Sequence, residues 1–175
     1  MVSLETERLT LRMFRDDDLE QYAPLCADPE VTRFLGDGST LDRAGAWRQM
    51  AFFVGHWHLR GYGLWAVEER ATGRLVGRVG FLNPEGWPGF ELAWTLAREH
   101  WGKGYATEAA RRALEYAFTE MGRERVISLI HPDNRASIRV AERIGEKPEG
   151  TTELFGHEVI IYGISRAGWQ TAARA

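Results

Sequence analysis

A glycine-bearing loop between an apolar strand and a long amphipathic helix is the feature that most constrains this chain. The segment from Phe90 to Leu96 has the apolar composition of a short strand. From Thr107 to Met121 apolar residues recur with helical spacing while charged residues fall between them, and Gly122 ends the pattern. A second apolar run, Val126 to Ile130, follows. The order strand, helix, strand predicts a βαβ unit.

Further strands are predicted on either side of this unit. Leu9 to Phe14 alternates apolar and polar residues, which is typical of a half-buried strand. Leu64 to Glu69 and Leu75 to Leu82 are expected to precede the strand before the glycine loop, in an antiparallel meander. Val159 to Ile164 is expected to be the last strand, after a turn near Gly156.

Capping residues and helical spacing place the other helices. The aspartates Asp16 to Asp18 favour a helix N-terminus in the segment that follows them. A longer helix is expected to end at Gly61, with Ser39 or Thr40 as its N-cap, and a shorter one spans Asn134 to Ile144. Together the elements predict an α/β fold whose twisted mixed sheet is antiparallel through the meander, parallel where the βαβ unit returns, and flanked by helices.

Length and charge narrow the class of protein. A chain of 175 residues without a repeat or a linker suits one domain, residues 1–175. Lys and Arg number 22 against 25 Asp and Glu, so no broad basic surface for nucleic acid or an anionic membrane is expected. Cys26 is the single cysteine, and the start lacks the basic-then-apolar order of a signal peptide. The chain is therefore expected to be cytoplasmic.

The glycine loop has the features of an anion site. Gly102 and Gly104 remove side chains where consecutive backbone N–H groups can turn toward a phosphate, and the helix N-terminus that follows adds its unpaired donors. Lys103 adds a point charge. The structural alternative is that the glycines only make a tight strand-to-helix connection. Neither a nucleotide P-loop nor a dinucleotide motif fits, because Lys103 precedes Gly104 and Thr107 stands at the third dinucleotide glycine.

The pattern that fits is Gln/Arg-x-x-Gly-x-Gly/Ala, the coenzyme A loop of the GNAT acetyltransferases, which falls on Trp101 to Ala106. The run Trp-Gly-Lys-Gly-Tyr-Ala-Thr-Glu-Ala resembles the branch that acetylates ribosomal-protein N-termini. Leu4 to Arg12 is similar to the opening strand of that branch, and Asn134 to Gly145 resembles its Asn-x-x-Ser helix. The resemblance extends from about Leu4 to Trp169.

The resemblance implies acetyl-CoA as cosubstrate and requires no metal. Pantetheine is expected beside the strand that ends at Leu96, and pyrophosphate on the glycine loop. The backbone N–H of Trp94 is expected to stabilise the oxyanion of the tetrahedral intermediate. The residues expected to bind the cofactor are Trp94, Leu96, Trp101, Gly102, Lys103, Gly104, Tyr105, Ala106 and Asn134.

Three positions depart from the family pattern. Trp101 stands at the usual Gln/Arg position, where the backbone N–H is the main contact. Ala141 stands where many GNAT enzymes have a tyrosine general acid, so the tyrosine mechanism is not expected here. Glu146 stands where an aromatic residue commonly follows the glycine, which makes the packing near the cofactor differ.

Two polar residues are the candidates for catalysis. By family resemblance Glu91 faces the reacting amine and acts as its general base, whereas a surface glutamate on the sheet is the structural alternative. Ser137 is expected to donate to the departing thiolate, whereas the alternative makes Asn134 an N-cap and Ser137 an ordinary first-turn residue. His100 and His131 flank this site, although structural roles are more common for such histidines.

The resulting interpretation is transfer of an acetyl group from acetyl-CoA to a primary amine, by direct attack in a ternary complex. The resemblance favours a peptide or protein N-terminal α-amine as acceptor, with a small-molecule amine as an alternative. A non-catalytic acyl-CoA-binding regulatory module is a further alternative, and Ala141 is the residue that most supports it. Both a monomer and a homodimer are compatible with the sequence.

Overall fold

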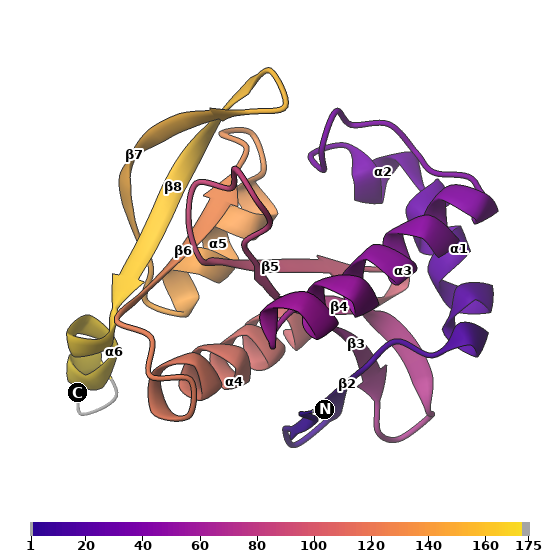
Figure 1. The fold of residues 1–175 in the computed structure, drawn as a ribbon, viewed down its shortest axis with the longest axis horizontal. Coiled ribbons are helices and arrows are strands. Elements are labelled where there is room, and N and C mark those ends of the chain that lie inside the picture. Colours follow the sequence, from indigo (N-terminus) through magenta and orange to yellow (C-terminus); the bar gives the residue numbers. More distant parts are fainter. Residues whose placement is uncertain (1, 173–175) are drawn as a thin grey trace.

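The computed structural model describes residues 2–172, in which eight strands form one mixed sheet in the order β1-β2-β3-β4-β5-β6-β8-β7 (Figure 1). The strands are β1 (Leu4–Glu5), β2 (Leu9–Arg12), β3 (Leu64–Glu69), β4 (Arg74–Leu82), β5 (Glu91–Leu96), β6 (Arg125–Ile130), β7 (Lys147–Leu154) and β8 (His157–Ser165). The helices are α1 (Leu19–Ala27), α2 (Pro29–Thr32), α3 (Arg43–Arg60), α4 (Tyr105–Thr119), α5 (Arg135–Arg143) and α6 (Arg166–Ala172), and 3₁₀ turns lie at Asp16–Asp18 and Arg98–His100.

The strand pairing confirms the predicted mixed α/β fold. Neighbouring strands are antiparallel from β1 to β5, whereas β5 and β6 are parallel and are joined through α4. Strand β8 then pairs antiparallel with both β6 and β7. The sheet is therefore antiparallel through the meander and parallel where the βαβ unit returns.

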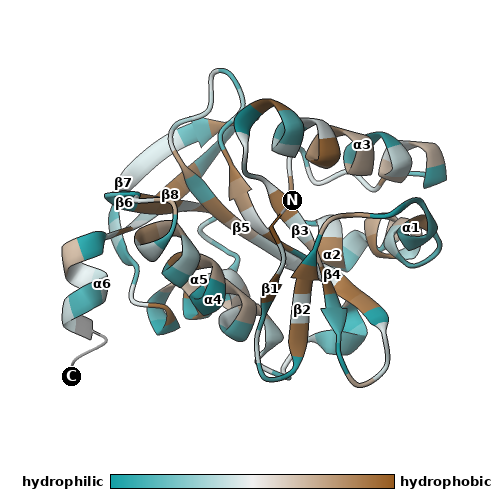
Figure 2. Cartoon of the chain, turned by 60° about the horizontal axis from the view of Figure 1, so that its bottom comes forward, coloured by the Kyte–Doolittle hydropathy of each residue, from teal (hydrophilic) through white to brown (hydrophobic). Residues whose placement is uncertain are grey.

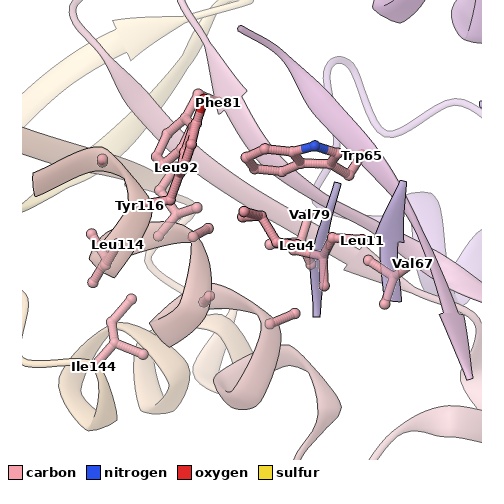
Figure 3. Packing of buried hydrophobic residues seen from close by; sticks show 14 of the residues in the cluster. Leu4, Leu11, Trp65, Val67, Val79, Phe81, Leu92, Leu114, Tyr116 and Ile144 are labelled. Carbon is pink, nitrogen blue, oxygen red and sulfur yellow. The ribbon is translucent and has the colours of Figure 1, made fainter. Parts of the chain in front are cut away.

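The two faces of the sheet carry separate hydrophobic clusters. On the α4 face, Trp65 is fully buried against Phe81 and Tyr116 (Figure 3). Trp57 of α3 also contacts its ring. On the other face, residues of α1 and α3 such as Phe53 pack over β3 and β4. The alternation of hydrophobic and hydrophilic residues that this requires is visible along β2 in Figure 2. Strands β3, β4 and β5 therefore direct their side chains alternately toward α4 and toward the α1–α3 layer.

Several predicted boundaries are wrong, each for a local reason. The N-cap of α3 is Asp42, whose Oδ1 accepts a hydrogen bond from Gly45 N at 2.6 Å, and not Ser39 or Thr40. Aspartate caps a helix as well as a hydroxyl residue does, and it stands directly before the first helical turn. Helix α4 begins at Tyr105 and not at Thr107, because Gly104 takes the left-handed conformation at the N-cap position.

The sequence pattern does not predict strand β7. Its residues are mostly exposed, so no apolar alternation marks it in the sequence. It forms because it pairs along its length with β8, from Lys147 opposite Gly163 to Leu154 opposite His157. The predicted first strand is also shorter than expected and ends at Arg12.

A buried ion-pair network joins the 3₁₀ turn at Asp16–Asp18 to strands β2 and β3. Arg12 in β2 donates from both Nη atoms to Asp18, at 2.8 and 2.7 Å, and from Nε to Glu68 in β3 at 2.7 Å. Asp18 also accepts a hydrogen bond from Arg15 N at 2.7 Å. Arg12 and Asp18 are almost fully buried, so removal of one partner leaves the other charged and desolvated.

We predict that Asp18→Asn lowers the free energy of unfolding by about 3 kcal/mol, because a buried Arg12 loses its principal counter-charge. Urea unfolding of the purified variant measures this change. The control is Glu20→Gln, which removes a carboxylate from the exposed pair with Arg43 and should change stability little. Equal small effects in the two variants would contradict the role of the Arg12 network.

Candidate active site

The divergence of β5 from β6 opens the central pocket of the molecule. The two strands share a single parallel register pair, Glu91 opposite Ile127, and beyond it they separate (Figure 1). The pocket has a volume of about 330 Å³ and is lined by residues of both strands, by the start of α5 and by α1 and α3. The loop between α2 and α3 and the tip of the β7–β8 hairpin complete its wall. We call this cavity the central pocket.

Glu91 lies at the first position of β5 and lines the central pocket. Its carboxylate accepts a hydrogen bond from Trp87 Nε1 at 2.7 Å, and only 6% of the residue is exposed. Burial raises the pKa of this carboxyl to about 7, although the Trp87 hydrogen bond acts in the opposite direction. A carboxyl with a pKa near neutrality can both accept and release a proton at physiological pH. The position is therefore not that of a surface glutamate.

A second buried carboxyl, Glu146, lies next to this site. Ser128 Oγ in β6 donates to Glu146 Oε1 at 3.1 Å, and it also lies 2.8 Å from the carbonyl oxygen of Leu92, where the β5–β6 ladder has ended. Glu146 Oε2 is buried without a hydrogen-bond partner among residues 2–172. Burial, together with a smaller effect of the charge of Glu91, raises the pKa of Glu146 to about 8, although the hydrogen bond with Ser128 acts in the opposite direction. The two carboxyl groups therefore influence each other's protonation.

Sequence reasoning identified Glu146 only as a departure in local packing. No local signal distinguishes it from an exposed glutamate, because charged residues are rarely fully buried and Glu146 directly follows Gly145 at the end of an amphipathic helix. Its burial, and with it the altered pKa, comes from the tertiary structure.

Asn134 and Ser137 both line the central pocket at the N-terminus of α5. Asn134 is the N-cap of the helix, and its Oδ1 accepts a hydrogen bond from Ser137 N at 3.1 Å. The structural alternative for Asn134 is thus confirmed. Ser137 is half-buried in the first turn and contributes a hydroxyl to the pocket wall. Ala141 is fully buried beneath Trp94 and supplies no polar atom from its side chain.

The glycine loop lies at the other end of β5 and leads into α4. Gly102 and Gly104 have φ angles of 76° and 82°, the left-handed region that glycine adopts without strain. The first hydrogen bond of the helix runs from Glu108 N to Gly104 O at 3.0 Å, so the N–H groups of Tyr105 and Ala106 have no partner within α4. These donors and the helix dipole form a cradle suited to an anion.

Side chains from the start of the chain hold this cradle in place. Arg8 Nη1 donates to the carbonyl oxygen of Lys103 at 3.0 Å, and its guanidinium also forms an ion pair with Glu108 at 2.6 Å. The same guanidinium lies over the ring of Tyr105, whose hydroxyl donates to Glu69 in β3. Sequence reasoning included Arg8 in a family-like segment but did not assign it to the loop. No local signal connects residues so far apart in the chain.

The remaining predicted cofactor residues lie where β5 meets the loop. Trp101 Nε1 donates to the carbonyl oxygen of Leu96 at 2.9 Å, and about half of Trp101 is exposed. Leu96 is buried in the α4-side cluster. Trp94 lines the central pocket and packs on Ile130 at the diverging end of β6. The predicted residues therefore follow one path, from the pocket along β5 to the cradle.

The two histidines expected to flank the site, His131 and His100, lie at opposite ends of β5. His131 lines the central pocket, and its Nδ1 accepts a hydrogen bond from Asp133 N at 3.1 Å. His100 is buried below the cradle, where burial lowers its pKa, and it does not line the pocket. Within residues 2–172 no three His, Cys, Asp or Glu side chains are grouped as metal ligands. Of the helices described, none is long and apolar enough to cross a membrane.

Comparisons with known proteins agree with this geometry. The sequence profile of the acetyltransferase (GNAT) domain matches residues 8–147. The crystal structure of an acetyltransferase from Agrobacterium tumefaciens str. C58 is similar with a TM-score of 0.83 and 32% identity, over 94% of each chain.

Curated relatives cover nearly the whole chain. The uncharacterized protein YkkB of Bacillus subtilis (strain 168) is 34% identical over 91% of this chain and 93% of YkkB. The uncharacterized N-acetyltransferase p20 of Bacillus licheniformis is 31% identical over 86% of this chain and 85% of p20. YdaF of B. subtilis (strain 168), a putative ribosomal N-acetyltransferase, is 26% identical over 94% of both chains.

The buried carboxyls predict a stability that falls as pH rises. Because the pKa of Glu146 is about 8 in the folded protein and near 4.5 when unfolded, the folded state binds its proton more tightly between these values. The stabilisation is complete below about pH 4.5 and is lost as pH rises through about 8. We predict that Glu146→Gln is more stable than the wild type at pH 8.5, and that this advantage disappears at pH 5.

One pKa unit corresponds to about 1.4 kcal/mol, so the difference between the two pH values should reach a few kcal/mol at most. Urea unfolding at both pH values measures it. Glu153→Gln, on the exposed β7 strand, is the matched control and should show no such pH dependence. An unchanged stability difference across this range would show that Glu146 ionises as an ordinary exposed carboxyl.

Proposed function

Because this chain belongs to the GNAT family of acetyltransferases, we propose that it transfers the acetyl group of acetyl-CoA to a primary amine bound in the central pocket. The family uses acetyl-CoA as its cosubstrate. The observation that carries the proposal is the path along β5, which begins at a buried carboxyl of raised pKa and leads at its other end into the anion cradle. Donor and acceptor then meet along one strand, in a ternary complex.

Coenzyme A is proposed to bind from the cradle toward the pocket. The pyrophosphate would accept hydrogen bonds from N–H groups of the loop from Gly102 to Ala106, with Lys103 adding positive charge. The pantetheine arm would lie along the open edge of β5, from Leu96 to Trp94, where β6 has diverged. Asn134, at the diverging end, faces the same pocket. This arrangement brings the thioester to the centre of the cavity.

The proposed reaction is a direct attack by the amine on the thioester carbonyl. Glu91, as carboxylate, takes a proton from the amine, directly or through water, while the new N–C bond forms. The backbone N–H of Trp94 stabilises the resulting oxyanion. When the C–S bond breaks, the Ser137 hydroxyl donates a hydrogen bond to the departing thiolate, which takes up a proton from water, and Glu91 releases to water the proton that it took from the amine. Ser137 has this role because Ala141 offers no hydroxyl.

The proposed acceptor is the N-terminal α-amine of a peptide or protein. An α-amine with a pKa near 7.8 is roughly 14% neutral at pH 7, whereas a lysine amine with a pKa near 10.4 is about 0.04% neutral. A base of pKa about 7 is therefore better matched to the α-amine. The name of YdaF, a putative ribosomal N-acetyltransferase, also favours this class. A small-molecule amine is the second candidate, favoured by the limited volume of the pocket, about 330 Å³.

We also propose one domain for residues 1–175, located in the cytoplasm, as a monomer or a homodimer. The single sheet through residues 2–172 supports the domain assignment, and residues 1 and 173–175 lie outside the described range. The net charge of -3 argues against nucleic acid as a partner.

The first test is binding of acetyl-CoA without an acceptor. At about 100 times its dissociation constant, acetyl-CoA should raise the free energy of unfolding by about 2.7 kcal/mol, whereas ATP and NAD at equal concentration should do much less. Gly104→Val should weaken this stabilisation, because valine is strained at a φ of 82°. Thermal shift and calorimetry measure both effects.

Gly122→Val is the control for Gly104→Val. Gly122 also has a left-handed φ, of 66°, but it follows the C-terminal end of α4, at the opposite end of this helix from the cradle. Its variant should lose stability and still bind acetyl-CoA as tightly as the wild type. Absence of heat and of a melting shift with acetyl-CoA in the wild type would contradict the proposed function.

The second test concerns the proton acceptor. Glu91→Gln should lower kcat by about 10² to 10⁴ while the affinity for acetyl-CoA is unchanged. In the wild type kcat/KM should fall as pH drops through about 7, and Glu91→Gln should retain only the slope due to the acceptor amine. Ser137→Ala should lower kcat with little change in cofactor binding. Glu85→Gln, fully exposed in the β4–β5 loop, is the control. If kcat falls less than threefold in both Glu91→Gln and Ser137→Ala, neither residue has the proposed role, and positioning of the substrates is the main contribution of the site to catalysis.

A further inference from the structure

Arg78 is a buried arginine whose role the proposed reaction does not explain. It lies in β4, opposite Ala66 of β3 and Thr95 of β5, and it lines the central pocket. Only 7% of the residue is exposed. Its guanidinium lies 5.0 Å from the ring of Phe53 in α3. The side chain is thus held between the sheet and the α1–α3 layer, at the edge of the cavity.

Arg78 has no direct ion-pair partner in the described part of the chain, although its charge opposes the rise that burial causes in the pKa of Glu91, from a longer distance, and in that of the neighbouring Tyr22. No carboxylate of residues 2–172 lies within ion-pair distance of it, and its Nε is buried without a hydrogen-bond partner. Arg12, the other buried arginine of the same sheet, is paired with both Asp18 and Glu68. A buried unpaired guanidinium carries a large desolvation cost, which the contact with one aromatic ring offsets only in part.

The sheet register places Arg78 and Glu91 on the same face. Arg78 is opposite Thr95, Gly80 is opposite Ala93, and Leu82 is opposite Glu91. Cross-strand partners project to the same side, so Arg78 and Glu91 lie on one wall of the pocket. Four residues of strand separate the two positions, or roughly 13 Å between Cα atoms. Both side chains are long enough to shorten this distance considerably.

The positions between them are occupied by the smallest residues. Ala93 lines the pocket, and Gly80 beside it has no room for a side chain, since a Cβ there would lie 2.4 Å from Gly63 O. The pocket surface between Arg78 and Glu91 therefore carries no large side chain. A molecule that lies on this surface can present one end to the carboxylate of Glu91 and the other to the guanidinium of Arg78.

We propose that the acceptor carries a carboxylate close to its amine, and that Arg78 binds this carboxylate while the amine lies at Glu91. The inference rests on the proposed function and specifies the class of its substrate. Guanidinium binds carboxylate through two parallel hydrogen bonds, which fixes orientation as well as charge. The carboxylate can be the α-carboxylate of a free amino acid or an acidic side chain within the first residues of a peptide. Both place a negative group a few bonds from an α-amine.

The test compares acceptors that differ only in this charge. One arm uses free amino acids and their α-amides, and the other uses amidated tripeptides with Asp or Glu against Asn or Gln in the first two positions. In the arm whose acceptors carry the carboxylate that Arg78 binds, the wild type should have a kcat/KM at least about tenfold higher for the acid than for its amide. A charge-assisted hydrogen bond contributes that much. Equal kcat/KM for acid and amide in both arms would overturn the inference.

Variants of Arg78 separate substrate binding from a structural role. Arg78→Met should abolish the preference for the acid mainly through KM, while the melting shift with acetyl-CoA is unchanged. Arg48→Met, exposed on α3, is the control and should keep the preference. If Arg78→Met does not fold, Arg78→Lys keeps the charge without the planar fork and should reduce the preference. Retention of the full preference in either folded variant would assign the carboxylate to another residue.

Two outcomes distinguish failure of this inference from failure of the proposed function. If neutral amides are acetylated as well as acids, the enzyme is an N-acetyltransferase and the assignment of Arg78 is wrong. If no amine in either arm is acetylated, the inferred substrate class is overturned, and the proposed function is then decided separately by the binding of acetyl-CoA. With CoA present, a melting shift produced by the acid and not by its amide supports the site independently of turnover.

Discussion

The single parallel register pair between β5 and β6 is the constraint on which the rest of the site depends. Because the strands separate after Glu91 and Ile127, the edge of β5 is left without a neighbouring strand at the centre of the sheet. Ser128 compensates in part, since its hydroxyl lies within hydrogen-bond distance of the carbonyl oxygen of Leu92 at the point where the ladder ends. Strand β5 begins at a buried carboxyl and leads into the glycine cradle, so this one short element positions both the proposed base and the proposed pyrophosphate site, whereas Ser137 comes from α5.

Local features of the sequence predicted most of the strands and helices and the position of the glycine loop. The strand at Leu64 to Glu69 and the helix end at Gly61 were predicted correctly, because an apolar run and a glycine stop are properties of neighbouring residues. The same holds for Gly102 and Gly104, whose positive φ angles follow from glycine itself. Strand β7 was missed because its partner β8, and not its own pattern, makes it a strand.

The charged residues of the site were harder to predict. Glu91 was identified by family resemblance, whereas its raised pKa comes from burial, which depends on the tertiary structure. Glu146 and Arg78 have no distinguishing local pattern. Each is buried because strands and helices distant in sequence close around it, and an average charged residue in the same sequence context would be exposed. The sequence therefore indicates the anion cradle more clearly than it indicates which acceptor the central pocket selects.

The contacts of Arg8 with Lys103 and Glu108 have a consequence for how the chain folds. They join residues that are 95 and 100 positions apart, so the cradle cannot acquire its final shape until more than half of the chain is present. Long-range contacts of this kind raise the contact order and slow folding. During synthesis from the N-terminus, β1, β2 and β3 can pair with one another before Lys103 and Glu108 have been made. Closure of the cradle is then a late event, and it also holds the N-terminal segment in place.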